Sequence, residues 1–313
     1  MIFRFLFVFL GLTAAAANAA GTLDAVAPRD PAKLKLASAS AIVLDASDGR
    51  AVYAKSANAV TPIASLTKLM TAIVTIDGGQ ALDEPIGIDI DDLDYLKGTR
   101  SRLRMGSELS RREMLQLALM ASENRAASSL ARHYPGGTAV FVAAMNAKAA
   151  SLGMTHTSYA DPTGLSPANV STASDLAILV NEAAKYSLVR DFSTTPSHYV
   201  DLQQNGRSLG FNNTNGLVKN SGWDIQLSKT GYIREAGKCL VMLATIASKP
   251  FVIVLLDSAG KYTRLGDAQR VRHWLETGQT LPAIAESKPA AKPRGKAKPV
   301  AYKATGKKSA LRS

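Results

Sequence analysis

The chain has 313 residues, and 46% of them are hydrophobic, which is enough for a large folded domain with a substantial core. Most of the formal net charge of +12 lies near the C-terminus, where residues 284–313 carry nine Lys or Arg against the single acidic residue Glu286. With only one cysteine, Cys239, no intramolecular disulfide can form. The four histidines are scattered without a His-Glu-x-x-His motif, so no metal or cofactor is indicated.

The N-terminus has the features of an export signal. Arg4 precedes a short apolar run, and Ala17-Asn18-Ala19 matches a small-x-small cleavage site. We therefore expect a cleavable signal peptide over residues 1–19, export to the periplasm, and a flexible Pro/Ala/Lys leader over residues 20–37. An uncleaved membrane anchor is the main alternative, although the apolar run is short for a membrane span.

The segments that follow the leader predict a hairpin and then a helix. The runs 41–46 and 51–56 have the composition of strands, and Asp48-Gly49 is typical of the turn that joins them. A helical run should begin at Ser65 and end near Asp77. Residues 80–108 are rich in Asp, Gly and Arg and predict loops with short strands.

Helices dominate the middle of the chain. Ser110 and Glu113 have the spacing of a capping box, and apolar residues with a helical period follow as far as Ala121. Further helices are expected after Asn124, over residues 137–153 and over residues 172–186.

The C-terminal part of the fold returns to strands. The apolar runs 239–246 and 251–257 predict paired antiparallel strands, and residues 267–278 predict a closing helix. Strands at both ends of the sequence predict an α+β fold, in which one antiparallel sheet is built from N- and C-terminal segments and a helical lobe lies between them. A catalytic cleft is expected between the lobe and the sheet. Cys239 opens an apolar run and should be a buried core thiol.

The stretch "IASLTKLMT" places Ser65 and Lys68 three residues apart on a helix, so the lysine amine can reach the serine hydroxyl. A serine hydroxyl is a weak nucleophile and needs a base, and a lysine serves only if its pKa is lowered. The alternative is a lysine whose amine reaches solvent at the helix edge, because this short pattern also arises by chance.

Two further motifs support a catalytic interpretation. Ser122 and Asn124 lie two apart at a predicted break between helices, where both side chains can point into a cleft; an ordinary helix cap is the alternative. Lys229-Thr230-Gly231 lies at the predicted end of a strand, where the glycine would allow a substrate backbone to approach; the alternative is a polar turn.

The three motifs together, Ser-x-x-Lys, Ser-Glu-Asn and Lys-Thr-Gly, resemble the signature of penicillin-binding proteins and class A β-lactamases, with Glu123 in place of the usual Asp. With the stretches "LALMASENRAASSLARHYPGG" and "GKYTRLGDAQRVRHWLETG", the chain is similar to the S11 family of D-alanyl-D-alanine peptidases, and most of all to its endopeptidases. The resemblance spans residues 38–280, which would form the catalytic domain with a serine β-lactamase/DD-peptidase-like fold.

The resemblance implies a role for each motif residue. Catalytic roles fall to Ser65 as nucleophile, Lys68 as general base and Ser122 as the proton relay to the leaving amine. Substrate binding would fall to Asn124, Lys229, Thr230, Gly231 and Tyr232, with the backbone N–H groups of Ser65 and Tyr232 forming an oxyanion hole. A second lysine near Lys68 should lower its pKa. The segment around Asp161, Thr163 and Gly164 and the segment at Gly216 are expected to be structural loops that border the site.

The resemblance implies a periplasmic enzyme that cuts D-Ala cross-links in peptidoglycan stem peptides and is acylated by β-lactams as covalent inhibitors. A carboxypeptidase that trims the terminal D-Ala remains the alternative. A β-lactamase is disfavoured because no Glu-x-x-x-Asn segment follows residue 124 and Glu182 lies in a predicted helix. A wall-binding protein without activity is disfavoured because the motif side chains are present.

The basic tail over residues 281–313 cannot build a core and should be disordered. Its expected partner is an anionic surface of the envelope rather than nucleic acid, because no aromatic-rich or helix-turn-helix pattern accompanies the charge.

Overall fold

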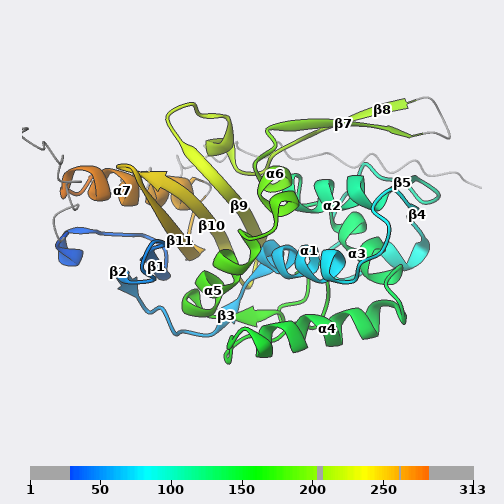
Figure 1. Ribbon diagram of the computed structural model, residues 1–313, viewed down its shortest axis with the longest axis horizontal. Helices are drawn as coiled ribbons and strands as arrows, with labels where there is room; N and C mark the ends of the chain where they lie inside the picture. The colour runs from blue at the N-terminus through cyan, green and yellow to red at the C-terminus, as the bar shows by residue number, and fades with distance from the viewer. Residues whose placement is uncertain (1–28, 203–206, 261, 282–313) are drawn as a thin grey trace, which may run out of the picture. The chain divides into compact units, whose positions relative to one another are not determined.

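The computed structural model describes residues 29–202, 207–260 and 262–281. The expected signal peptide and nearly all of the expected tail lie outside these residues. The described part contains a five-stranded antiparallel sheet in the order β2-β1-β11-β10-β9. Its strands are β1 (Ser40–Asp45), β2 (Ala51–Lys55), β9 (Asp224–Ile233), β10 (Gly237–Ile246) and β11 (Lys249–Ser258). The predicted sheet from both ends of the sequence is therefore confirmed (Figure 1).

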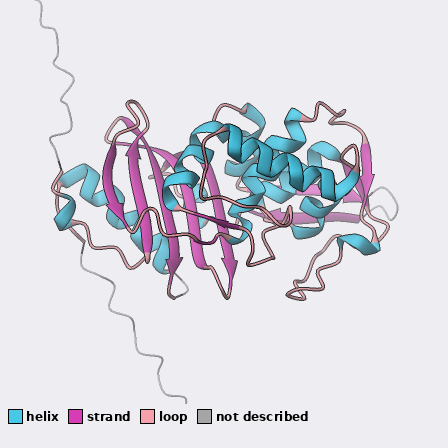
Figure 2. Cartoon of the chain, turned by 90° about the horizontal axis from the view of Figure 1, so that it is seen from below, coloured by secondary structure: helices cyan, strands magenta, loops and turns pink. Residues whose placement is uncertain are grey.

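Helices lie on both faces of this sheet and form a lobe beside strand β9 (Figure 2). They are α1 (Lys68–Asp77), α2 (Arg111–Met120), α3 (Asn124–Arg132), α4 (Gly137–Ser151), α5 (Ala173–Ala183), α6 (Ser187–Thr194) and α7 (Thr263–Thr277). Successive residues of a strand point to opposite faces, so each strand contributes to two cores. Val241 and Val254 pack with the lobe helices, whereas Met242 and Ile253 pack with α7.

Short elements connect these parts. The paired strands are β3 (Thr61–Pro62) with β6 (Val170–Ser171), β4 (Pro85–Gly87) with β5 (Glu108–Ser110), and β7 (Ser197–Leu202) with β8 (Arg207–Asn212). In the part of the chain that the structure describes, four 3₁₀ turns complete the order: η1 (Pro31–Lys33), η2 (Ala64–Thr67), η3 (Ile90–Asp92) and η4 (Gly216–Lys219).

Three sequence predictions need correction. The first turn of the helix expected from Ser65 is the 3₁₀ turn η2, and the α-helix begins at Lys68. The Lys-Thr-Gly motif lies inside β9 rather than at its end, since the strand continues to Ile233. The leader is not flexible over its second half: Leu34 and Leu36 are buried in the α7 core.

The predicted capping box and the buried cysteine are confirmed. Ser110 and Glu113 form the expected capping box of α2, because each side chain accepts a hydrogen bond from the other residue's backbone N–H. Cys239 is fully buried. Within the described ranges, no helix combines the length and the apolar character that a membrane span needs.

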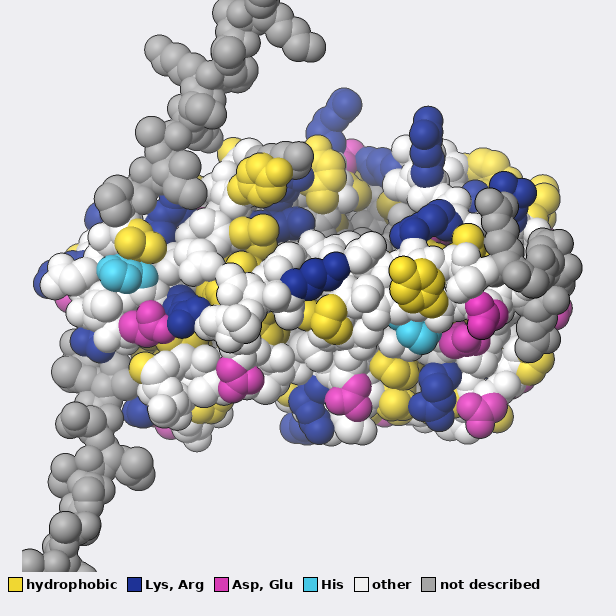
Figure 3. Space-filling model, turned by 90° about the horizontal axis from the view of Figure 1, so that it is seen from above, with side chains coloured by type: hydrophobic (Ala, Val, Ile, Leu, Met, Phe, Trp, Pro, Cys, Tyr) yellow, Lys and Arg dark blue, Asp and Glu magenta, His cyan; other side chains and the backbone are white. Residues whose placement is uncertain are grey.

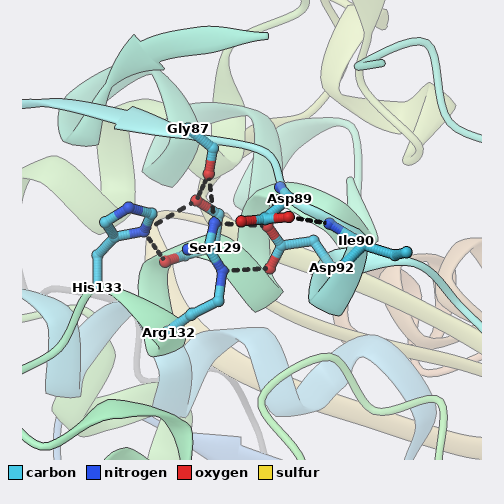
Figure 4. A network of polar contacts seen from close by, with 7 residues as sticks. All are labelled: Gly87, Asp89, Ile90, Asp92, Ser129, Arg132 and His133. Atoms are coloured by element: carbon cyan, nitrogen blue, oxygen red, sulfur yellow. Dashed lines mark hydrogen bonds and ion pairs between the residues drawn. The ribbon is translucent and has the colours of Figure 1, made fainter. Parts of the chain in front are cut away.

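A polar network ties α3 to the segment that follows β4 (Figure 4). Arg132 donates to the buried carboxylate of Asp92 at 2.9 Å and to the carbonyl of Gly87 at 2.7 Å. Ser129 donates to the same carbonyl, and His133 Nδ1 lies 3.3 Å from its hydroxyl. The network fixes the start of the 93–107 loop on the helix that begins at Asn124.

Candidate active site

A cleft of about 710 Å³ lies between the sheet and the helical lobe. One wall comes from β9 and the turn after it, and the other from η2, the α2–α3 connection and the 93–107 loop. Sequence-predicted site residues on its surface are Ser65, Ser122, Asn124, Thr230, Gly231 and Tyr232. The predicted cleft position and the meeting of the three motifs are therefore confirmed.

Two glycines allow the walls to close on the turn that carries Ser65. A Cβ on Gly231 would lie 3.0 Å from the Ile63 carbonyl oxygen and 3.2 Å from the Ser65 amide nitrogen. A Cβ on Gly164 would lie 2.0 Å from the Ala64 carbonyl oxygen, and Gly164 also has φ +80°. Gly231 thus lets β9 approach the serine's own turn, and because it also lines the cleft, the expected approach of a substrate backbone there stays a prediction. Ala64, with φ +49°, stores strain directly before Ser65.

Lys68 lies fully buried with three oxygen partners. Its Nζ is 3.0 Å from Ser65 Oγ, 2.7 Å from Asn124 Oδ1 and 2.6 Å from the Thr163 carbonyl oxygen. The amide oxygen and the carbonyl can only accept hydrogen bonds. In its neutral form the amine can donate its two N–H groups to them, so its lone pair faces the Ser65 hydroxyl.

Burial lowers the pKa of Lys68 to about 8, although the carboxylates of Asp161, Glu123 and Asp94 oppose the change. The neighbouring Lys229 is also fully buried, and burial together with the charge of Lys68 holds its pKa well below the ordinary value. We expected the second lysine to lower the pKa of Lys68, but burial accounts for the low value, and the repulsion between the two lysines lowers the pKa of Lys229 instead.

Ser122 connects the second motif to the third. It has a left-handed backbone with φ +58°, which is costly for a serine and is typical of functional sites. Lys229 Nζ donates to its Oγ at 2.9 Å. On β9, Thr230 donates from its hydroxyl to Thr214 Oγ1 at 2.7 Å, and Thr214 also lines the cleft.

Glu123 is buried and does not line the cleft. Its carboxylate accepts a hydrogen bond from the Arg125 amide and caps α3, while burial raises its pKa. The departure of this motif from Ser-Asp-Asn therefore affects a capping position. Only the first and third side chains, Ser122 and Asn124, face the site.

The segment around Asp161 contributes more than the border that we expected. Asp161 accepts hydrogen bonds from the amides of Thr163, Gly164 and Ser166 and shapes a tight turn. This turn directs the Thr163 carbonyl to Lys68. We expected Gly216 to border the site. Gly216 does not line the cleft, but Thr214, two residues before it, does.

Sequence reasoning missed several cleft residues that belong to no motif. They are Leu96, Lys97, Thr99, Thr214, Glu235 and Arg264. Lys97 and Glu235 form an ion pair at 2.6 Å between the lobe and the sheet. Arg264 donates to the carbonyls of Gly231 at 2.8 Å and of Cys239 at 3.2 Å.

Other charged side chains lie outside the cleft. Glu182 forms ion pairs with Lys148 and Lys185 and does not line the cleft. On the face shown in Figure 3, Lys and Arg side chains are interspersed with Asp and Glu. No group of three His, Cys, Asp or Glu residues able to hold a metal ion occurs in the part of the chain that the structure describes.

Comparisons with known proteins identify the family of this chain. The family model of the S11 peptidases, described as D-alanyl-D-alanine carboxypeptidase, matches residues 25–260. A D-alanyl-D-alanine endopeptidase of Pseudomonas aeruginosa is 52% identical over 259 residues, which cover 82% of this chain and 84% of the relative. The D-alanyl-D-alanine endopeptidase of Escherichia coli K12 is 48% identical over 251 residues, which cover 80% and 81%.

A solved structure resembles the fold over most of its length. The Streptomyces K15 DD-transpeptidase has a TM-score of 0.72 and 28% identity, and the match covers 78% of this chain and 98% of that chain. The α+β fold class and the resemblance predicted from the motifs are thus confirmed. The chain belongs to the S11 family of serine D-alanyl-D-alanine peptidases.

Proposed function

We propose that this protein is a periplasmic D-alanyl-D-alanine endopeptidase, which hydrolyses D-Ala cross-links in peptidoglycan through an acyl-enzyme on Ser65. The observation that carries the proposal is Lys68 Nζ at 3.0 Å from Ser65 Oγ, buried so that its pKa is about 8. A lysine with this pKa is partly neutral near pH 7 and can accept the serine proton.

In the first half of the reaction, Ser65 Oγ attacks the carbonyl carbon of D-Ala while its proton moves to Lys68 Nζ. The oxyanion that forms would accept hydrogen bonds from the backbone N–H groups of Ser65 and Tyr232. Preorganised donors of this kind each contribute on the order of 3 kcal/mol. Support comes from Gly231, which places β9 directly against the Ser65 turn.

The C–N bond then breaks, and the leaving amine needs a proton. Ser122 is the proposed relay, because its Oγ accepts a hydrogen bond from Lys229 Nζ and lines the cleft. Water hydrolyses the ester in the second half and restores Ser65. Asn124 would bind the substrate amide, and Lys229 with Thr230 would bind a substrate carboxylate.

The endopeptidase assignment is supported by the two relatives at 52% and 48% identity, both named endopeptidases. Carboxypeptidase activity is the second candidate, since the family model carries that description. The same acylation step predicts covalent inhibition by β-lactams.

The proposed location follows from the sequence. Residues 1–19 have the pattern of a cleavable export signal, and peptidoglycan stem peptides are accessible in the periplasm. The cations of residues 284–313 would bind an anionic surface of the envelope.

The test is mass spectrometry of purified cross-linked muropeptide dimers and of pentapeptide monomers after incubation with the protein. Conversion of dimers to monomers by the wild type but not by Ser65→Ala is expected. Loss of one D-Ala from pentapeptides with intact dimers would favour the carboxypeptidase. No product from either substrate would refute the catalytic proposal.

A further inference from the structure

A directed chain of hydrogen bonds leads from the catalytic lysine to a carboxylate in the 93–107 loop. Lys68 donates to Asn124 Oδ1, which leaves the Asn124 amide nitrogen to donate to Thr99 Oγ1 at 3.0 Å. The Thr99 hydroxyl then donates to Asp94 Oδ2 at 2.6 Å. Since a carboxylate only accepts, Asp94 makes the Thr99 hydroxyl a donor, so Thr99 Oγ1 accepts from the Asn124 amide nitrogen and the Asn124 amide oxygen faces Lys68.

The Asp94 carboxylate is itself held by the loop backbone. It accepts from the amides of Leu96 at 2.9 Å, Lys97 at 2.8 Å and Thr99 at 2.8 Å. Burial alone would raise the pKa of Asp94, but these bonds and the one from the Thr99 hydroxyl hold its pKa below the ordinary value. Asp94 is therefore a fixed acceptor.

Clamps at both ends keep the loop in register with Asn124. At the start of the loop, Asp92 is paired with Arg132 on α3, the helix whose first residue is Asn124 (Figure 4). Towards its end, Arg125 donates to the Leu103 carbonyl at 2.6 Å. Because both clamps end on α3, the loop and Asn124 are parts of one packed unit.

We propose that Thr99 and Asp94 are positioning residues for the acylation of Ser65, which hold the carboxamide of Asn124 with its oxygen toward Lys68. The inference rests on the proposed function. An asparagine amide can rotate by half a turn with little change in shape, and its NH₂ group would then face Lys68. In that orientation the lysine loses one of its two acceptor-only partners, and its lone pair no longer has a single direction toward Ser65.

Asp94 also acts through its charge. Lys68 is faced by the carboxylates of Asp161, Glu123 and Asp94, which raise its pKa, and by the buried amine of Lys229. Removal of the Asp94 charge should lower the pKa of Lys68. Lys68 would then stay neutral to lower pH, so the acid limb of the plot of acylation rate against pH should shift to lower pH.

The test is acylation of the full chain by a fluorescent penicillin from pH 6 to pH 10, with the saturating rate and the half-saturating concentration measured separately. Thr99→Val keeps the shape of the side chain but loses the hydroxyl, and Thr99→Ser keeps the hydroxyl. Thr155→Val, at an exposed threonine outside the cleft, is the matched control. Thermal melting checks that each variant is folded.

We expect Thr99→Val to lower the saturating rate by roughly five- to tenfold, the effect of one lost hydrogen bond, with little change in half-saturation. Thr99→Ser and Thr155→Val should stay within about twofold of the wild type, and Asp94→Asn should shift the acid limb to lower pH. Wild-type rates for Thr99→Val, or equal losses for Thr99→Val and Thr99→Ser, would overturn the positioning role. A wild type that is never labelled, like Ser65→Ala, would overturn the proposed function as well.

Discussion

Substitution of Gly231 by alanine tests whether the contact between β9 and the Ser65 turn sets the geometry of acylation. The added Cβ would lie 3.0 Å from the Ile63 carbonyl oxygen, 3.1 Å from Ala64 Cβ and 3.2 Å from the Ser65 amide nitrogen. These distances are short enough that the turn and the strand must separate by roughly a few tenths of an ångström.

This separation would act directly on the proposed oxyanion hole, because one N–H donor comes from Ser65 and the other from Tyr232 on β9. Complete loss of one donor costs about 10²–10³ in rate. Since Gly231→Ala displaces the donors without removing either, we expect acylation to slow by roughly 10- to 100-fold.

The free energy of unfolding should change much less than the acylation rate in Gly231→Ala. Gly231 does not have a positive φ, and an alanine in a strand gains about 0.5–1 kcal/mol over glycine, which partly offsets overpacking of about 1–3 kcal/mol. Gly164→Ala is the contrasting variant, because its Cβ would lie 2.0 Å from the Ala64 carbonyl oxygen and its φ is +80°. For Gly164→Ala we expect the free energy of unfolding to fall by about 3 kcal/mol or more, which corresponds to a decrease in Tm of about 10 °C.

Stopped-flow labelling with a fluorescent penicillin gives the acylation rate, and thermal unfolding gives the stability of both variants. Gly231→Ala should be slow yet nearly as stable as the wild type. A Gly231→Ala protein that is acylated at the wild-type rate would refute the reasoning. A decrease in Tm as large as that of Gly164→Ala would also contradict it, because the contact would then support the fold rather than the chemistry.

Three further predictions concern charge. Because neutral Lys68 is the proposed base and its pKa is about 8, acylation should rise with pH up to about 8 and then level off; a flat profile from pH 6 to pH 10 would argue against this base. Asp267→Ala removes the ionic partner of buried Arg270 and should lower the free energy of unfolding by about 3–5 kcal/mol, measured by urea denaturation; a change below about 1 kcal/mol would contradict it. Deletion of residues 284–313 should abolish salt-sensitive binding to anionic vesicles without changing acylation; binding that survives the deletion would assign it to another surface.

The parts of the fold that sequence patterns predicted are those with a local physical cause. The capping box of Ser110 and Glu113 and the apolar runs of β10 and β11 act within a few residues of themselves. The same patterns were less accurate where tertiary contacts decide the local structure. The turn at Ser65 is 3₁₀ rather than α-helical, and it packs between β9 and the Gly164 loop.

The leader shows the same limit. Its Pro/Ala/Lys composition is typical of a flexible segment, yet residues 29–37 have specific partners far away in the sequence. Asp267 on α7 accepts hydrogen bonds from the backbone amides of Ala37 and Ser38, and Arg29 donates to the Leu275 carbonyl. Two buried leucines, Leu34 and Leu36, supply the apolar contact. Composition alone could not reveal partners that are more than 200 residues distant.

Sequence patterns likewise predicted only part of the candidate site. Motifs reveal side chains that react, but a buried lysine also needs acceptors that keep its amine oriented, and these need no particular side chain. One acceptor of Lys68 is the backbone carbonyl of Thr163, which any residue could supply. Its position depends on Asp161 and Gly164, so the sequence records it only as a turn. The other acceptor, Asn124, depends on Thr99 for its orientation. The candidate nucleophile Ser65 is therefore readable from three short motifs taken together, whereas the proposed orientation of Lys68 depends on loops whose residues show no catalytic pattern.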